Sequence, residues 1–105
     1  MEVYSTKLYD KWFARLKDKV AKVKIESRIR RILTNSDYGD CEKISNNVTE
    51  LKIDYGPGYR IYLTTRAQKI LILLAGGNKS TQVRDIKKAK KIALKIKIER
   101  VSEWG

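Results

Sequence analysis

The stretch Tyr55–Gln82, YGPGYRIYLTTRAQKILILLAGGNKSTQ, carries the side chains best suited to binding an anion. It begins with a Gly-Pro-Gly turn and a strand that bears Arg60, and it continues into the apolar run Ile70–Ala75, which is typical of a strand covered on both faces. The run ends at Gly76-Gly77-Asn78, where the backbone can turn sharply and place Lys79 at the start of a helix. We therefore expect basic and hydroxyl groups to gather near the ends of the most buried elements, namely Arg60, Lys79, Ser80 and Thr81.

Two alternating segments, Val48–Asp54 and Tyr59–Thr65, predict a pair of antiparallel strands and also the register between them. Matching apolar faces gives the pairs Ile53 with Tyr59, Leu51 with Ile61, Lys52 with Arg60, and Glu50 with Tyr62. Two cations on opposite strands are unfavourable unless an anion lies beside them. Either Glu50, diagonal to Arg60, or a bound phosphate supplies it, and both apply if Glu50 positions Arg60 while leaving part of its guanidinium free.

The composition indicates a single domain, residues 1–105, with a strongly basic surface. There are 24 Lys and Arg residues against 12 Asp and Glu, which gives a formal net charge of +12 and a sequence pI of about 9.9. A charge of this size opposes compaction by self-repulsion, so it favours a function with a polyanionic or acidic partner over that of a merely soluble basic domain. Nucleic acid and an acidic protein are both compatible with it.

The residues that are missing exclude several kinds of chemistry. Histidine is absent, which removes the usual general base and the commonest metal ligand, so we expect neither a metal site nor a cofactor. Cys41 is the single cysteine, so an intramolecular disulfide is excluded and a reducing compartment fits. No signal-peptide core or membrane span is present in the sequence, and we expect a cytoplasmic protein without a membrane partner.

The remaining elements predict an α+β fold. A short strand at Glu2–Tyr4 precedes a helix capped by Ser5 or Thr6 and a second, basic helix from about Lys19 to Leu33, which together form a helical hairpin. The hairpin should pack on a twisted antiparallel sheet, and a lysine-rich C-terminal helix should begin at Ser80. We expect Trp12 in the core rather than as a base-stacking platform. The predicted core comprises Leu8, Trp12, Leu16, Ile25, Ile29, Leu51, Ile53, Ile61, Leu63 and Ile70–Leu74.

The motifs GPGYRIY and LLAGGNKSTQ, followed by Asp85-Ile86, resemble the RelE/ParE toxin superfamily, in particular the HigB-like, phage-associated addiction module killer proteins. The resemblance extends from Phe13 through Gly39-Asp40 to the C-terminal helix. It implies the toxin of a type II toxin–antitoxin module, whose partners are the ribosome, mRNA and an acidic helix-turn-helix antitoxin. Many members are mRNA interferases that cut mRNA in the ribosomal A site and so arrest translation and growth. A ParE-like inhibitor of DNA gyrase and a non-catalytic RNA-binding module are the alternatives.

The resemblance also suggests roles for single residues. Arg60 matches the strand arginine that contacts the scissile phosphate in RelE-like enzymes, and Lys79 lies where those toxins place further basic residues. Lys43 and Lys52 fall on strands where other members carry active-site lysines. The C-terminal tyrosine of RelE-type toxins has no match, because Arg84-Asp85 stands there, and a histidine-dependent HigB mechanism is excluded.

An endoribonuclease of this kind would work without a metal, through attack of the ribose 2′-hydroxyl on the adjacent phosphate. A lysine whose pKa is lowered by neighbouring cations, Lys79 or Lys52, could act as the base, with Glu50 and Asp85 as alternatives and Tyr62 as a candidate acid. The candidate catalytic residues are therefore Arg60, Lys79, Lys52, Glu50 and Asp85. The candidate RNA-binding residues are Lys43, Tyr62, Ser80, Thr81, Gln82 and Arg84.

Overall fold

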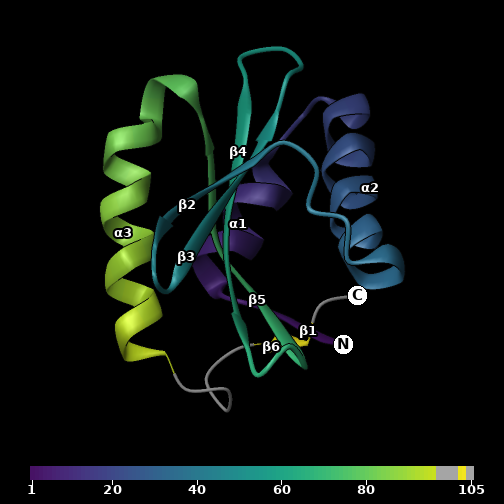
Figure 1. Cartoon of the computed structure of the whole chain (residues 1–105). Coiled ribbons are helices and arrows are strands. Elements are labelled where there is room, and N and C mark those ends of the chain that lie inside the picture. Colours follow the sequence, from purple (N-terminus) through teal and green to yellow (C-terminus); the bar gives the residue numbers. More distant parts are fainter. Residues whose placement is uncertain (97–101, 104–105) are drawn as a thin grey trace.

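The computed structural model describes residues 1–96 and 102–103. The elements are, in order, β1 (Glu2–Ser5), α1 (Lys7–Arg15), α2 (Lys19–Asn35), β2 (Cys41–Ser45), β3 (Val48–Ile53), β4 (Tyr59–Arg66), β5 (Ile70–Asn78), the short 3-10 helix η1 (Lys79–Thr81), α3 (Gln82–Lys95) and β6 (Ser102–Glu103) (Figure 1). No helix in this described part of the chain is both long and apolar enough to span a membrane.

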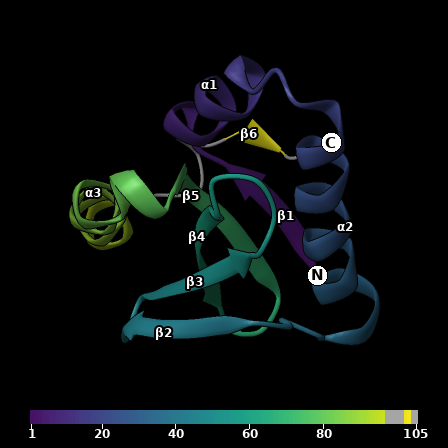
Figure 2. The same ribbon diagram turned by 90° about the horizontal axis from the view of Figure 1, so that it is seen from above.

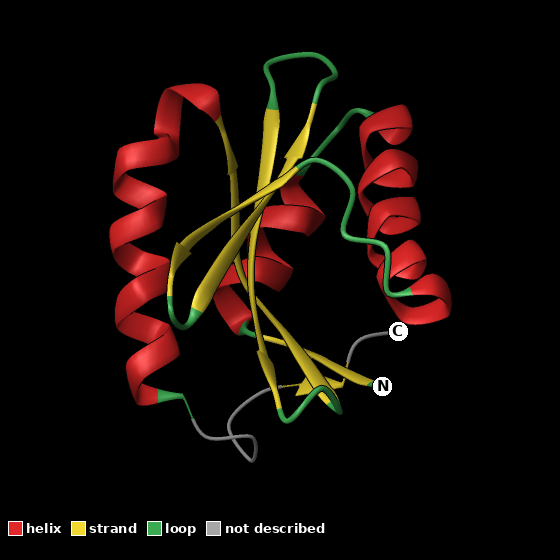
Figure 3. Cartoon of the chain, viewed as in Figure 1, coloured by secondary structure: helices red, strands yellow, loops and turns green. Residues whose placement is uncertain are grey.

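The strands form one sheet in the order β2-β3-β4-β5-β1-β6, with helices on both sides of it (Figure 3). The predicted antiparallel pairing is confirmed for β2 through β5. It is wrong for β1, which runs parallel to β5. A parallel neighbour requires a long crossover connection, and α1, α2 and the intervening hairpins supply it. Strand β5 thereby becomes an interior strand, as its unbroken apolar run predicts.

The predicted register between β3 and β4 is confirmed. Glu50 lies opposite Tyr62, Leu51 opposite Ile61, Lys52 opposite Arg60, and Ile53 opposite Tyr59. Leu51, Ile53 and Ile61 face α1 and α2, whereas Val48 and Tyr62 face α3. The apolar pattern fixed this register because a slip of one residue would exchange the two faces.

One side of the sheet is covered by α1 and α2 and the other by α3 (Figure 2). On the first side the apolar stripe of α2 joins a core cluster with residues of β1, β3, β4 and β5. The predicted core positions Ile25, Ile29, Leu51, Ile61 and Leu63 are each 0% exposed. On the second side Ala89 and Ala93 of α3 lie against Ile72 and Leu74. Strand β5 is therefore buried on both faces, as predicted.

The prediction for Leu8 is wrong, because this side chain is 37% exposed. The Thr6 hydroxyl accepts a hydrogen bond from the Tyr9 amide and caps α1. In the helix that begins there, Tyr9 is 1% exposed and takes the buried position expected for Leu8. The face toward the sheet consequently carries Tyr9, Trp12, Phe13 and Leu16. Trp12 and Leu16 are half-buried against the core, and the packing of Trp12 there agrees with the core interpretation.

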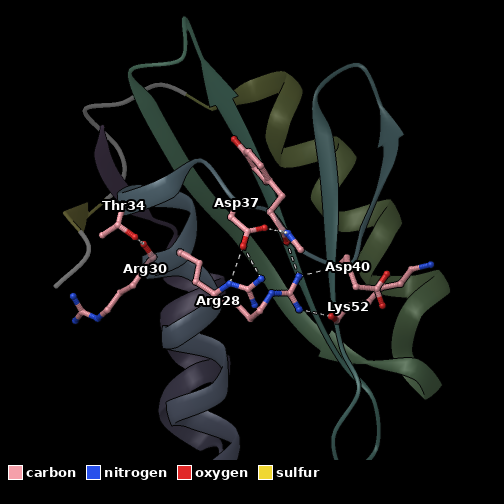
Figure 4. A network of polar contacts seen from close by, with 9 residues as sticks. Arg28, Arg30, Thr34, Asp37, Asp40 and Lys52 are labelled. Carbon is pink, nitrogen blue, oxygen red and sulfur yellow. Dashed lines mark hydrogen bonds and ion pairs between the residues drawn. The ribbon is translucent and has the colours of Figure 1, made fainter.

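Arg28 joins α2 to the loop that leads into β2 (Figure 4). One guanidinium nitrogen donates to the Lys52 carbonyl at 2.5 Å, and the other donates to the Tyr38 and Asp40 carbonyls at 2.6 and 2.9 Å. Gly39 has a φ of +64°, and a Cβ there would lie 2.9 Å from Arg28 Nη2. Since these bonds hold the β2–β3 hairpin against α2, they also fix the strand that carries Glu50 and Lys52.

Candidate phosphate-binding site

The candidate site lies on the α3 side of the sheet, where β3 and β4 pair. Glu50 and Tyr62 are 0% exposed, and Arg60 is 8% exposed. The pairing places Glu50 directly opposite Tyr62, with Arg60 diagonal to it. The first turn of α3 contributes Asp85, which is also buried. Two carboxylates, one guanidinium and one phenol are thus brought together on a single face.

Three polar atoms of this group are buried without a hydrogen-bond partner in the part of the chain that the structure describes: Glu50 Oε1, Arg60 Nε and Tyr62 Oη. Arg60 uses Nη1 for a bond to the Tyr59 carbonyl at 3.1 Å. Buried polar atoms in native proteins are paired in the great majority of cases, so a concentration of unpaired ones marks a place suited to a polar ligand. The free donor capacity of Arg60 suits an anion such as a phosphate.

Tyr62 is held in its neutral form. Burial raises the pKa of Tyr62 most, and the adjacent Glu50 carboxylate raises it further, while the charge of Arg60 lowers it. The Tyr62 hydroxyl lies beside Glu50 but does not meet hydrogen-bond geometry. A protonated phenol beside a carboxylate retains a proton that it can donate.

Lys79 and Arg60 converge on Gly58. A Cβ built on Gly58, where φ is +78°, would lie 3.4 Å from Lys79 Cδ and 3.5 Å from Arg60 Nη1. The Lys79 amide also donates to the Gly58 carbonyl at 2.9 Å. The expected gathering of Arg60 and Lys79 is therefore present, with Lys79 exposed at the surface and Arg60 behind it.

The hydroxyls of Ser80 and Thr81, expected to bind RNA, also take part in the hydrogen bonds at the entry into α3. Asn78 Oδ1 accepts from the Ser80 amide and hydroxyl, and Thr81 Oγ1 accepts from the Asn78 amide at 3.1 Å. The Thr81 hydroxyl donates to Asp85 Oδ2 at 2.5 Å, and Asp85 Oδ1 lies 3.4 Å from Arg84 Nε. Both oxygens of Asp85 are therefore already engaged.

The expected low pKa of Lys52 is contradicted. Its ammonium forms an ion pair with Glu42 at 2.9 Å, and this hydrogen bond raises the Lys52 pKa, which is the opposite of what a neutral base at physiological pH requires. Sequence reasoning missed this pair because Glu42 lies on β2, whose weak apolar alternation does not determine its register with β3.

The other basic candidates lie further out. Lys43 is exposed on the edge strand β2, opposite Thr49 and separated from β4 by β3. Arg84 is exposed in a shallow groove along the outer side of α3, lined by Ser80, Thr81, Val83, Arg84, Lys87 and Lys88. Gln82, predicted to bind RNA, donates a hydrogen bond to Glu50 Oε2 at 2.8 Å. Within residues 1–96 and 102–103, no cluster of His, Cys, Asp and Glu is arranged to hold a metal ion.

The architecture is a RelE-like α+β fold. A double arginine-to-alanine mutant of the E. coli toxin RelE in the free state superimposes with a TM-score of 0.68, covering 87% of this chain and 97% of that one, at 14% sequence identity. The sequence itself is 42% identical over 96 residues, 91% of this chain and 96% of the relative, to a Haemophilus influenzae protein described as uncharacterized. The chain belongs to the same family as this Haemophilus protein. No model of a known protein family matches the sequence.

Proposed function

We propose that the chain is the toxin of a type II toxin–antitoxin module, of the HigB-like branch, and acts in the cytoplasm as a ribosome-dependent mRNA endonuclease. The observation that carries this proposal is the buried Arg60 with an unpaired Nε, beside Lys79, on a RelE-like fold. The net charge of +12 supports a polyanionic substrate. Fold alone does not assign a function, so the proposal depends on the chemistry of this site.

The reaction we propose is an internal transfer at one phosphodiester. The ribose 2′-oxygen attacks the phosphorus, its proton passes to a protein base, and the bond to the 5′-oxygen breaks as that oxygen takes up a proton. The products carry a 2′,3′-cyclic phosphate and a 5′-hydroxyl. Arg60 stabilises the charge that develops on the phosphate oxygens, and Lys79 adds a second positive charge at the surface.

Among the candidate bases, Glu50 has the best-suited geometry. Lys52 is paired with Glu42, and both oxygens of Asp85 are hydrogen-bonded or paired, whereas Glu50 Oε1 is free. We assign to Tyr62, whose pKa is raised by burial and by Glu50, the role of returning a proton to the leaving oxygen. Because Glu50 is covered in the free chain, RNA reaches it only after side chains over it move, as expected when catalysis depends on binding to the ribosome.

A protein this basic and harmful requires a neutralising partner, and we propose a small acidic helix-turn-helix antitoxin. It can act by covering the surface around Arg60 and Lys79, or by occupying a helix face and blocking entry to the ribosome. The outer side of α3 favours the second route, because it presents exposed lysines together with Val83 and Leu94, which are 73% and 76% exposed. Complementary charge would accelerate the encounter.

The deciding experiment is to induce the chain in bacteria and to map RNA 5′ ends on translated messages. Growth arrest with new 5′ ends inside translated codons supports the proposal. Intact messages with inhibited supercoiling would identify a gyrase inhibitor instead. Salt-sensitive RNA binding without growth arrest would identify a non-catalytic RNA-binding module.

A further inference from the structure

Gln82, the first residue of α3, connects this helix to the buried carboxylate of β3. Its side-chain amide donates to Glu50 Oε2 at 2.8 Å, across 32 positions of sequence. Gln82 is half-buried and Glu50 is 0% exposed. This is the one hydrogen bond of regular geometry that the Glu50 carboxylate receives from the described part of the chain.

This hydrogen bond gives the two carboxylate oxygens of Glu50 different surroundings. Gln82 holds Oε2, while Oε1 has no such partner. Tyr62 lies directly opposite and Arg60 diagonally across the strand pair, and both have unpaired polar atoms of their own. A carboxylate that can rotate would present either oxygen to its neighbours, whereas one held at Oε2 presents Oε1 consistently. A group held in a fixed orientation reorganises less during reaction.

We propose that Gln82 is a positioning residue, which fixes the Glu50 carboxylate so that Oε1 is directed to the reacting atoms beside Arg60 and Tyr62. The inference rests on the proposed endonuclease function and assigns Gln82 a role through Glu50 instead of direct contact with RNA. It also makes the start of α3 a part of the catalytic site, since any displacement of this turn would release Glu50.

The groups around Glu50 determine how the proposal can be tested by pH. Arg60 and Tyr62 face Glu50 from β4, and Asp85 lies in α3. Lys52, on the same strand as Glu50, interacts electrostatically with the Glu50 carboxylate. Gln82→Glu places a second carboxyl group against Glu50. Two adjacent carboxyl groups cannot both ionise easily and share one proton as the pH falls, which restores a hydrogen bond between them. This pH dependence is expected if residue 82 acts through its hydrogen bond to Glu50.

The experiment measures cleavage of mRNA on purified ribosomes by the wild type, Gln82→Leu, Gln82→Glu and the control Val20→Ala, whose side chain is 51% exposed on α2. Gln82→Leu keeps the volume but removes the donor, and we expect kcat to fall about tenfold with KM changed less than about twofold. Gln82→Glu should lose more activity near neutral pH and regain it as the pH falls, whereas Gln82→Leu should not. Val20→Ala should match the wild type.

A double-mutant cycle with Glu50→Gln separates the role through Glu50 from any independent one. If Gln82 acts through Glu50, then adding Gln82→Leu to Glu50→Gln lowers kcat no further. Three outcomes would overturn this inference while leaving the proposed function intact, provided that the wild type cleaves. They are additive losses of kcat in the double variant, a wild-type kcat in Gln82→Leu, and no recovery of activity at low pH in Gln82→Glu. A wild type that leaves ribosome-bound mRNA intact overturns the proposed function and this inference together.

Discussion

Gly77 and Asp85 lie so close that no side chain fits between them: a Cβ on Gly77 would be 1.9 Å from Asp85 Oδ2. Gly77 lies opposite Arg60 in the sheet, and Asp85 belongs to the first turns of α3. The missing side chain therefore lets the helix start approach the strand that carries the arginine. The spacing between α3 and the candidate site depends on this contact.

Gly77→Ala should push α3 away from β5 and lower the free energy of unfolding by about 1–3 kcal/mol, as overpacking typically does. The methyl group would meet a carboxylate that is fixed by Thr81, so the clash cannot be relieved by a simple rotation. Chemical denaturation measures the effect, and the exposed substitution Val83→Ala serves as the control. An unchanged denaturation midpoint would show that α3 is not held at this distance.

Arg60→Ala should reduce RNA cleavage by about 10²–10³-fold, because it removes one charge-stabilising contact. Arg60→Lys should restore only part of the rate, since a lysine keeps the charge but loses the planar fork. Lys69→Ala, in the exposed turn between β4 and β5, is the matched loss of charge and should leave the rate unchanged. A folded Arg60→Ala protein with full toxicity would remove Arg60 from the site.

Lys52→Arg should leave cleavage within about threefold of the wild-type rate, because Lys52 forms an ion pair with Glu42 that raises its pKa. An arginine keeps the positive charge and the partner Glu42 but cannot act as a base near neutral pH. Single-turnover cleavage measures the rate, with Glu42→Gln as a companion that removes the pair from the other side. A loss of several hundredfold in Lys52→Arg alone would restore Lys52 as the base.

The pairing of β3 with β4 and the position of Arg60 on β4 could be predicted from the sequence. The hydrogen bonds and ion pairs of the individual candidate residues could not. Alternation fixed the β3–β4 register and so placed Glu50 opposite Tyr62 and diagonal to Arg60. The hydrogen bond between Gln82 and Glu50 could not be predicted from the sequence, because it depends on how α3 docks on the sheet. Docking is determined by tertiary packing, which a local sequence pattern does not specify. The ion pair of Lys52 with Glu42 could not be predicted for a different reason, because the weak apolar alternation of β2 leaves its register with β3 undetermined.

Stability should fall steeply above about pH 10 because of two buried tyrosines. Burial raises the pKa of both Tyr9 and Tyr62 above the ordinary value of 10.0. In the unfolded chain these phenols lose their protons near that ordinary value, while the folded chain keeps them. The stabilisation is therefore complete below pH 10.0 and is lost as the pH rises further.

Replacing both residues, Tyr9→Phe and Tyr62→Phe, should flatten this alkaline decline. Urea unfolding from about pH 8 to pH 11 measures the slope. Tyr38→Phe is the weaker comparison, because that side chain is only partly buried and its pKa is raised less. Equal slopes in the wild type and the double variant would show that neither phenol is kept protonated by the fold.

The outer side of α3 should supply the contact with the antitoxin. Val83→Ser with Leu94→Ser should weaken the complex by at least about tenfold, since both exposed apolar side chains would be covered by the partner. Val20→Ser with Val23→Ser makes the same kind of change on α2, where the two valines are 51% and 66% exposed, and should leave the affinity unchanged. Calorimetry with the antitoxin, the protein encoded by the neighbouring gene, measures the affinity of both double variants. The association rate should fall with added salt, because the surrounding lysines attract an acidic partner. Hydrogen exchange on the complex gives the result that would contradict this prediction. Protection confined to residues 50–62 and 76–82, with both helix faces unchanged, would place the antitoxin over the surface around Arg60 and Lys79.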